Sequence, residues 1–355
     1  MQRRAPDTLP TPPASPACAS ITASSNWPLQ QCGHDHPRVS DKKTGTLLDG
    51  RLRLAEILGT GSYGIVYLAV DLETGARYAV KCLTKLDADG NALGCRLLTY
   101  QQREIRLHCL VSAHPNVVSI IDILDDCDCT YVVMEYCAEG DLFQNITESD
   151  QFVGNDEACK RVFLQLLDAV AYCHVYGIYH RDLKPENILV SGEGQTVKLA
   201  DFGLATSDER SADYGCGSTF YMSPECLDST VGEHPYYMCA PNDVWSLGII
   251  LINLTCGLNP WEQASFDDRA YRSYTGSRNF FKDILPLSAE LVDVLLQVFN
   301  PDPERRITLS ELRDGIIACA NFTAPAVTVV TEPTHLRHIA APVIKEHAIN
   351  DDAHD

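Results

Sequence analysis

The stretch HRDLKPENILV at residues 180–190, together with KLADFG at 198–203, decides how this chain folds. It holds four side chains with complementary chemistry. Asp182 can accept a proton, Lys184 can screen developing negative charge, and Asn187 and Asp201 can bind magnesium ions. Each short motif alone is weak evidence, because an isolated aspartate is most often a loop cap. The combination in this order predicts the catalytic centre of a phosphoryl-transfer enzyme.

The residues between the two motifs predict how they are held together. Apolar runs at 188–190 and 197–199 flank SerGlyGluGlyGln, a glycine-rich turn sequence. This pattern is typical of a two-stranded hairpin. Such a hairpin would place Asp182 and Asp201 on opposite sides of one pocket.

Composition and charge exclude several classes of function. The chain has 355 residues and a net charge of −20, so no basic excess is available for nucleic acid or an anionic membrane surface. Its 15 cysteines are odd in number and scattered, which favours free thiols in a reducing, intracellular compartment over a disulfide scaffold. The longest apolar stretch, 244–258, is too short and too polar for a membrane span and predicts a buried helix. No feature indicates an oligomeric state.

The pattern along the chain predicts a Pro/Ser/Thr-rich disordered leader at 1–46, one catalytic domain at 47–320 and a poorly ordered tail at 321–355. CysGlyHisAspHis at 32–36 lacks a second ligand cluster and is a poor metal site. Within the domain, strand patterns dominate about 51–136 and helix patterns about 138–318, which predicts two lobes. The expected helices lie at 97–111, 156–176, 242–257, 288–299 and 308–318.

A glycine-rich segment and a lysine complete the expected site from the first lobe. GlyThrGlySerTyrGly at 59–64 joins two predicted antiparallel strands, which fits a lid over phosphates and not the strand-to-helix turn of a dinucleotide site. Lys81 ends the next strand. The only acid between Arg96 and Ala113 is Glu104, so a Lys81–Glu104 ion pair would orient the lysine toward phosphates.

These motifs, with SerProGlu at 223–225 and AspValTrpSerLeuGly at 243–248, stand in the order of eukaryotic protein kinases, which the chain resembles over about 51–318. Lys184 and GlySer at 217–218 look like the serine/threonine branch. The segments GluIleArgLeuHis at 104–108 and GlyCysGlySerThrPheTyrMetSerProGluCys at 215–226 are similar to a fungal group that restrains meiosis and responds to nutrients. The resemblance implies an α+β, two-lobed fold: a five-stranded antiparallel sheet with one main helix in the N-lobe, and a mostly helical C-lobe.

The resemblance also implies ATP and Mg²⁺ as cofactors and Ser/Thr hydroxyls of proteins as acceptors. The catalytic residues would be Asp182, Lys184, Lys81 and Glu104, and the metal ligands Asn187 and Asp201. Nucleotide contacts would come from Leu58, Gly59, Gly61, Gly64, Val66, Ala79, Lys81, Glu135, Cys137 and Leu189, with Met134 at the back of the pocket. In supporting roles, Ser218 would contact Asp182 and Lys184, Glu225 would pair with Arg306, and Asp243 would brace the catalytic loop.

Two departures from the family pattern concern regulation. His108 stands where relatives carry an aliphatic residue against Phe202, and we expect it to be a hydrogen-bonded core histidine. In related kinases, an arginine directly before the catalytic aspartate, here Arg181, usually marks activation by phosphorylation of the activation segment. Tyr214 occupies the position at which many of these relatives carry a phosphothreonine. We therefore expect Asp213 or a neighbouring acid to pair with Arg181 and replace the phosphate.

Substrate preference is the remaining expectation. By resemblance, Glu139 and Asp141 would bind a ribose hydroxyl or an arginine three residues before the acceptor, and Glu186 an arginine two residues before it. Asn253 replaces an acid that often helps Glu186, so the basic preference should be stronger at the more distant position. The alternatives are a pseudokinase scaffold, which the intact catalytic set disfavours, and a small-molecule kinase, which the SerProGlu segment disfavours.

Overall fold

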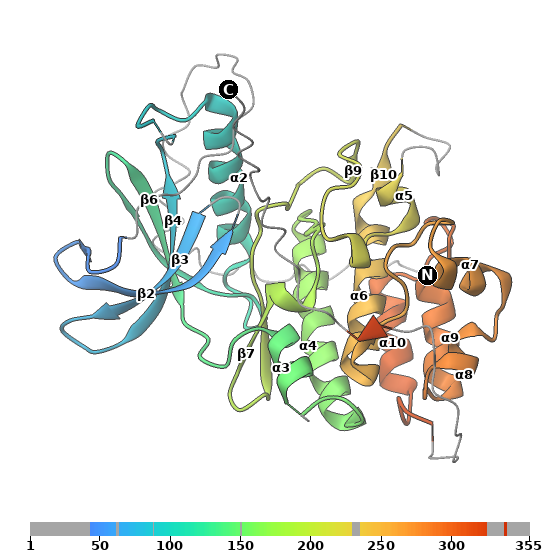
Figure 1. The fold of residues 1–355 in the computed structure, drawn as a ribbon. Coiled ribbons are helices and arrows are strands. Elements are labelled where there is room, and N and C mark those ends of the chain that lie inside the picture. The colour runs from blue at the N-terminus through green and yellow to red at the C-terminus, as the bar shows by residue number, and fades with distance from the viewer. Residues whose placement is uncertain are drawn as a thin grey trace, which may run out of the picture.

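The structure is a computed structural model that describes residues 43–61, 64–87, 89–149, 151–228 and 235–324, together with the strand at 337–338. Figure 1 shows two lobes: a twisted sheet with one long helix on one side, and a bundle of helices on the other. The chain passes between them after β6. This α+β architecture confirms the predicted fold class.

The N-lobe sheet is antiparallel and has six strands in the order β1-β2-β3-β4-β6-β5. Their bounds are Leu47–Leu48, Leu52–Gly61, Gly64–Asp71, Arg77–Thr84, Ile120–Asp125 and Cys129–Glu135. The prediction of five strands was one short because it began at Arg51. Asp49 and Gly50 have φ of 47° and 64°, and the Arg51 amide donates to the Leu48 carbonyl at 3.0 Å. This Asp-Gly turn folds β1 back onto β2.

Helix α2, Cys95–Val111, connects the two lobes through its buried face. Ile105 packs in one cluster with side chains of the sheet, whereas Leu107 and Val111 join the core of the C-lobe. Leu107 is 1% exposed and Val111 is fully buried, so each contributes about 1.5–3 kcal/mol through burial. The helix therefore couples the position of its polar residues to both lobes.

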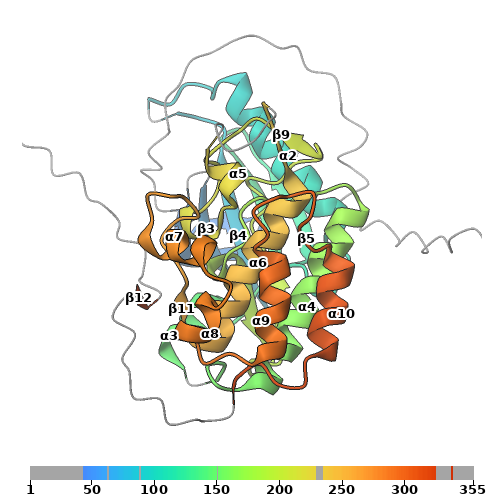
Figure 2. The same ribbon diagram turned by 90° about the vertical axis from the view of Figure 1, so that its right-hand side faces the viewer.

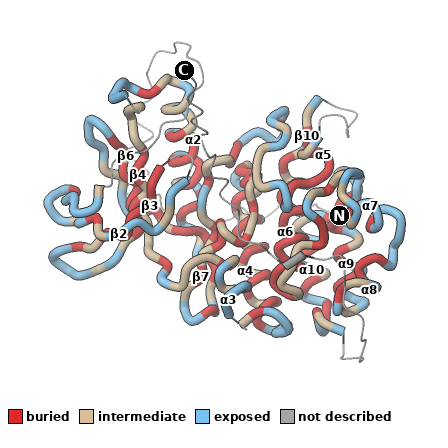
Figure 3. The backbone as a smooth tube through the Cα atoms, in the orientation of Figure 1, coloured by how far each residue is buried: buried red, intermediate tan, exposed pale blue. Residues whose placement is uncertain are grey.

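The C-lobe is built around α6, Cys239–Cys256, whose residues are buried on nearly every side. Figure 3 shows this helix as a red centre enclosed by more exposed elements. Its apolar stretch is a core helix, as predicted. Among the described residues, no helix has the length and hydropathy that a bilayer span requires.

The remaining elements of the C-lobe surround α6 (Figures 1 and 2). The helices are α3 (Leu142–Glu148), α4 (Asp156–Val175), α5 (Pro224–Leu227), α7 (Arg269–Gly276), α8 (Phe280–Ile284), α9 (Ala289–Val298) and α10 (Leu309–Ala318). Short 3-10 turns lie at Pro185–Asn187 and Thr219–Tyr221. Three two-stranded ladders pair β7 (Ile188–Ser191) with β8 (Thr196–Leu199), β9 (Arg210–Ser211) with β10 (Tyr237–Met238), and β11 (Leu258–Asn259) with β12 (Arg337–His338).

The packed domain extends beyond the predicted boundaries of 47 and 320. The Lys43 amide donates to the Tyr67 hydroxyl at 3.1 Å, so the last residues assigned to the leader lie against the sheet. At the other end, Phe322 is 1% exposed and its amide donates to Asp156 at 2.7 Å. Neither end has the hydrophobic periodicity that marks a helix or a strand, so the sequence pattern does not predict these contacts. The rest of the predicted leader, with the Cys/His cluster at 32–36, lies outside the described residues.

Candidate active site

A cleft of about 990 Å³ lies between the two lobes. Cavities of this size take nucleotide-sized ligands. Every residue that the sequence suggested for nucleotide or metal contact lines it, namely Leu58, Gly59, Gly61, Gly64, Val66, Ala79, Lys81, Glu135, Cys137, Asn187, Leu189 and Asp201. Asp182 and Lys184 lie next to the cleft. Asp182 accepts a hydrogen bond from Asn187, which lines the cleft, and forms an ion pair with Lys184.

Apolar side chains from both lobes face the cleft. Leu58, Val66 and Ala79 belong to the N-lobe strands, and Leu189 belongs to β7 of the C-lobe. Met134 is opposite Ala79 in the β4–β6 register and also lines the cleft. Two apolar walls from different lobes can hold a flat aromatic ring by dispersion and burial.

The glycines of the first hairpin differ in what they permit. A Cβ on Gly64 would lie 2.3 Å from the Cys82 carbonyl oxygen, so packing alone requires glycine there. A Cβ on Gly59 would meet nothing within 4 Å, and one on Gly61 only the Gly64 carbonyl at 3.9 Å. Those two positions are open, and their backbone is free to approach a ligand closely. Ser62 and Tyr63, at the tip, lie outside the described residues.

Lys81 bridges the two lobes by its ammonium group. It forms an ion pair with Glu104 of α2, and its Nζ lies 3.2 Å from Asp201 Oδ1. Burial acts to lower the pKa of Lys81, but the charges of Glu104 and Asp201 outweigh burial, so the pKa lies above its ordinary value. The lysine is therefore a fixed positive charge at the cleft, and the predicted Lys81–Glu104 pair is present.

Asp182 sits in a hydrogen-bonded cluster that fixes both of its carboxylate oxygens. The Ser218 hydroxyl donates to Oδ1 at 2.9 Å, while Lys184 Nζ lies 2.9 Å from Oδ2. Lys184 also donates to the Ser218 hydroxyl at 2.8 Å. Asn187 Nδ2 donates to Oδ2 at 3.1 Å and to the Asp182 carbonyl at 2.8 Å. The expected contacts of Ser218 with Asp182 and Lys184 are confirmed.

Asn187 and Asp201 have the chemistry of a magnesium site. Because the Asn187 amide nitrogen is turned toward Asp182, its amide oxygen is the atom directed to other ligands. Burial acts to raise the pKa of Asp201, but the positive charge of Lys81 outweighs burial. The pKa therefore lies below its ordinary value, and the carboxylate stays ionised. No group of three or more His, Cys, Asp or Glu in the described ranges is arranged to hold a metal. Two oxygen ligands suit Mg²⁺ that also binds phosphates.

Asp243 braces the loop that carries Asp182. Its carboxylate accepts the amides of His180 at 2.9 Å and Arg181 at 2.8 Å, and a hydrogen bond from His174 Nε2 at 2.8 Å. Arg181 has φ of 65°, a left-handed conformation that costs a non-glycine residue about 1–3 kcal/mol. The buried carboxylate holds the loop in that strained form, as expected of Asp243.

A buried ion pair anchors the segment that follows Ser218. Arg306 Nη1 and Nη2 donate to the two carboxylate oxygens of Glu225 at 2.6 and 3.0 Å. The Arg306 side chain is fully buried, and its guanidinium lies 4.9 Å from the Trp245 ring centroid. The predicted pair is present, and it ties α5 to the start of α10.

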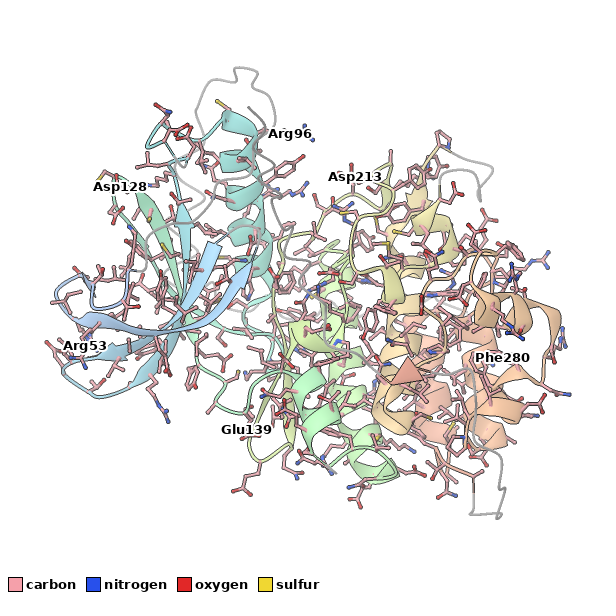
Figure 4. The ribbon with its side chains drawn as sticks, viewed as in Figure 1. Arg53, Arg96, Asp128, Glu139, Asp213 and Phe280 are labelled. Atoms are coloured by element: carbon pink, nitrogen blue, oxygen red, sulfur yellow. The ribbon has the colours of Figure 1, made fainter. Side chains whose placement is uncertain are left out.

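Arg181 is the link between the catalytic loop and the activation segment. Its Nε donates to the Leu204 carbonyl at 2.8 Å, and its Nη1 donates to the Ser211 hydroxyl at 2.8 Å and to Asp213 at 3.2 Å. Figure 4 shows Asp213 on the loop that faces the N-lobe side of the helical bundle. The expected pairing of Arg181 with Asp213 is present. Ser211 was missed, since no sequence motif marks it as a partner of Arg181.

His108 is a buried, hydrogen-bonded histidine, as expected. Its Nε2 lies 2.7 Å from the Val118 carbonyl oxygen and therefore donates. The ring stacks on Phe202 with 4.7 Å between centroids. Burial lowers the pKa of His108 from 6.5 to about 4, so the ring is neutral at physiological pH.

The structure changes the expectation for Glu139. Its two carboxylate oxygens accept the amides of Glu193 and Gly194, each at 2.8 Å, at the turn of the β7–β8 hairpin (Figure 4). Both oxygens are thus engaged by backbone and not directed to an arginine. No sequence motif predicts these hydrogen bonds, because Glu193 and Gly194 lie far along the chain from Glu139.

The other two candidate acids remain available. Asp141 caps α3 by accepting the Gln144 amide at 2.8 Å, and burial raises its pKa. Glu186 Oε2 is buried without a hydrogen-bond partner in the described residues, and burial raises the pKa of this carboxyl as well. An acceptor left unpaired in this way favours a cationic ligand.

Comparison with known proteins gives the same result as the geometry. A family model described as a protein kinase domain matches residues 52–315. A negative regulator of sexual conjugation and meiosis from Schizosaccharomyces pombe is 47% identical over 297 residues, which cover 79% of this chain and 62% of that protein. The serine/threonine-protein kinase VHS1 from Saccharomyces cerevisiae is 34% identical over 322 residues, covering 75% of this chain and 69% of that protein. The chain thus spans about two thirds of the length of these relatives.

Proposed function

The chain belongs to the protein kinase family, and we propose that it transfers the γ-phosphoryl group of ATP to serine and threonine hydroxyls of proteins. The observation that carries this proposal is the arrangement of Asp182, Lys184 and Ser218. The Asp182 carboxylate lies beside the Lys184 ammonium group and the Ser218 hydroxyl, at the edge of a cleft large enough for a nucleotide. Several of its relatives are named as serine/threonine-protein kinases.

In the proposed reaction, the substrate hydroxyl oxygen attacks the γ-phosphorus, and the bond from that phosphorus to the β-phosphate oxygen breaks to release ADP. The hydroxyl proton passes to an Asp182 carboxylate oxygen. Lys184 and Lys81 stabilise negative charge on the phosphoryl group and on the remaining phosphates. Magnesium, held by Asn187 and Asp201, would neutralise phosphate oxygens.

The structure favours an enzyme over a pseudokinase scaffold. A scaffold does not need Lys81 bonded to both Glu104 and Asp201, nor an aspartate whose two oxygens are fixed. These contacts require the two lobes and α2 to be in an arrangement suited to catalysis. Arg181 also has a left-handed φ of 65°, a strained conformation of the kind that is frequent at active sites.

Basal activity should not require phosphorylation of the activation segment. Arg181 already has a carboxylate, a hydroxyl and a carbonyl as partners, from Asp213, Ser211 and Leu204. These groups engage Nε and Nη1 of Arg181, which are donors that a phosphate could otherwise bind. Protein treated with phosphatase should therefore keep its activity, and loss of activity that returns on phosphorylation of Ser211 would contradict the idea.

Substrates should carry basic residues before the acceptor. The net charge of −20 and the unpaired, buried Glu186 oxygen support this preference. Both Glu139 oxygens are engaged by the hairpin and Asp141 Oδ1 caps α3, whereas Glu186 Oε2 has no partner among the described residues. We therefore expect the residue two before the acceptor to matter more than the residue three before it, the reverse of the order that the sequence suggested. A peptide library with arginine placed at each position in turn, compared between wild type and Glu186→Gln, measures this. Equal turnover of acidic and basic peptides would refute it.

The relatives suggest a process for the chain. One is named as a negative regulator of sexual conjugation and meiosis, so a role in meiotic entry is part of the proposal. A response to nutrients is proposed from the resemblance seen in the sequence alone. The cysteines of the described residues are all free thiols, which supports a reducing, intracellular site. No nucleic-acid partner is expected.

The experiment is phosphate transfer from labelled ATP to a basic protein, followed by phosphoamino-acid analysis, for wild type and Lys81→Met. Wild type should label serine and threonine, and Lys81→Met should lose about 100-fold or more in rate, because a fixed charge at the phosphates is removed. Equal labelling by both proteins would indicate a contaminating kinase and remove the proposal.

A further inference from the structure

A short ladder joins the activation segment to the strand that precedes α6. Strands β9 and β10 pair antiparallel, with Arg210 opposite Met238 and Ser211 opposite Tyr237. Figure 1 shows the two strands next to each other, close to α5. Backbone groups make the ladder, so its formation requires neither a phosphate nor a charged side chain.

The ladder continues into the first turn of α6. Cys239 is the first residue of this helix, and its amide donates to the Glu209 carbonyl at 2.9 Å. Hydrogen-bonded pairs alternate along an antiparallel ladder, so Ser211 and Tyr237, two residues away on each strand, form the next hydrogen-bonded pair. The activation segment is thus held by backbone bonds at both Glu209 and Ser211.

The same turn of α6 holds the catalytic loop. Asp243 lies four residues after Cys239 and accepts the amides of His180 at 2.9 Å and Arg181 at 2.8 Å. Cys239 and Asp243 are both fully buried, which makes this turn a close-packed part of the core. The start of α6 therefore fixes the catalytic loop and the activation segment relative to each other.

The ladder also sets the position of the Ser211 hydroxyl. This hydroxyl accepts a hydrogen bond from Arg181 Nη1 at 2.8 Å and one from the Asp213 amide at 3.1 Å, and Ser211 is buried. The Asp213 side chain, in contrast, is 70% exposed, and an ion pair so open to solvent contributes little. Backbone pairing at Ser211 is therefore a stronger link to Arg181 than the Asp213 carboxylate.

Side chains on both strands reinforce the ladder, but they are few. The Arg210 guanidinium lies 4.7 Å from the centroid of the Tyr236 ring, and the Tyr214 and Tyr237 rings are 5.9 Å apart. Residues 207–210 are exposed. Because so few contacts hold this part of the segment, the docked form should exceed the undocked form by only a small factor.

We propose that β10 and the first residue of α6 are a positioning element for the kinase reaction, whose backbone bonds hold the activation segment in its catalytic form. This inference rests on the proposed kinase function and deepens it, because it names the contact that makes phosphorylation of the segment unnecessary. One net hydrogen bond corresponds to roughly 2- to 10-fold in the ratio of docked to undocked segment. Loss of the Cys239 N–H should therefore lower kcat of the unphosphorylated protein by about 2- to 10-fold.

Cys239→Pro removes this single donor. Proline is well tolerated at the first position of a helix, and Met238 before it has the extended conformation, with φ of −85° and ψ of 124°, that a following proline requires. Cys239→Ala is the matched control, because it also removes the thiol but keeps the N–H. Cys239 does not line the nucleotide cleft, so both variants should bind ATP like wild type.

Two measurements on the phosphatase-treated full chain separate docking from catalysis. Hydrogen exchange at the Ser211 and Tyr237 amides should be about 2- to 10-fold faster in Cys239→Pro than in Cys239→Ala, with exchange in α9 equal in both. The kcat for a basic peptide should fall by the same factor in the proline variant only, with the KM for ATP unchanged. Wild type needs no variant to show the ladder: Ser211 should exchange about 10-fold more slowly than exposed Ala212, after correction for sequence.

Equal exchange at Ser211 and Ala212 in wild type, or equal exchange at Ser211 in the two variants, would overturn the ladder whether or not the protein transfers phosphate. Faster exchange in the proline variant with an unchanged kcat would overturn the positioning role. If wild type transfers no phosphate, the proposed kinase function fails, while the exchange data still decide whether the ladder forms.

Discussion

Replacing His108 with leucine should change how stability depends on pH. The ring is 5% exposed, donates to the Val118 carbonyl and stacks on Phe202. Burial lowers its pKa from 6.5 to about 4, with Lys81 acting in the same direction. Between these two values the unfolded chain binds a proton that the folded protein does not. The stability contributed by neutral His108 is thus present above pH 6.5 and is lost as the pH falls toward 4.

The loss follows from the size of the pKa shift. Each pKa unit corresponds to 1.36 kcal/mol, so the full shift of His108 costs the wild type roughly 3 kcal/mol between pH 6.5 and 4. At pH 7.5 the leucine variant should be less stable by about 1 kcal/mol, because the Val118 carbonyl loses its donor. The two stability curves should therefore cross as the pH falls.

The assay is chemical denaturation followed by circular dichroism from pH 7.5 to 4.5, without nucleotide or magnesium. His108→Asn is the matched control, because it removes the titrating group but keeps a donor for Val118. Both variants should lose less stability than wild type over this range. Parallel curves for all three proteins would refute the assignment of a neutral, buried His108.

Three further substitutions test other parts of the structure. Asp213→Asn weakens an exposed partner of Arg181, and basal kinase activity should fall by about 2- to 5-fold, whereas no change in a steady-state assay would show that the pair is unimportant. Arg306→Ala leaves Glu225 buried without its partner, and denaturant titration should show a loss of about 3–5 kcal/mol; a loss below 1 kcal/mol would contradict the buried pair. Gly248→Ala places a Cβ 2.5 Å from a side chain at the end of α9, so thermal unfolding should reveal about 1–3 kcal/mol of destabilisation, and unchanged stability would contradict this close packing.

Local pattern was enough to predict the β7–β8 hairpin, the long helices and the residues at the centre of the site. The hairpin between 188 and 199 and the long helices have periodicity that depends on neighbouring residues alone. Glu104 was identified by elimination, as the only acid on its helix, and the structure places it on Lys81. The strand β1 was not predicted although Asp49-Gly50 is a strong turn signal, because two residues are too few to show the alternation of a strand.

Contacts between distant segments could not be predicted in this way. The Glu139 carboxylate is bound by amides of Glu193 and Gly194, and this depends on how the hairpin folds back against the link between the lobes. The Ser211 hydroxyl reaches Arg181 only because the activation segment returns to the catalytic loop. In both cases the donor and acceptor types are common in loops, so the sequence alone gave no reason to pair them.

Nucleotide affinity and phosphoryl transfer, measured on the same preparations of wild type and Asp182→Asn, test the proposed function most directly. Asp182 contacts Ser218, Lys184 and Asn187 and does not line the cleft, so the substitution should leave ATP affinity within about 3-fold. Transfer to a basic protein should fall by at least about 100-fold, because the proton acceptor is lost. Unchanged transfer at unchanged ATP affinity would contradict the assignment of Asp182 as the catalytic base.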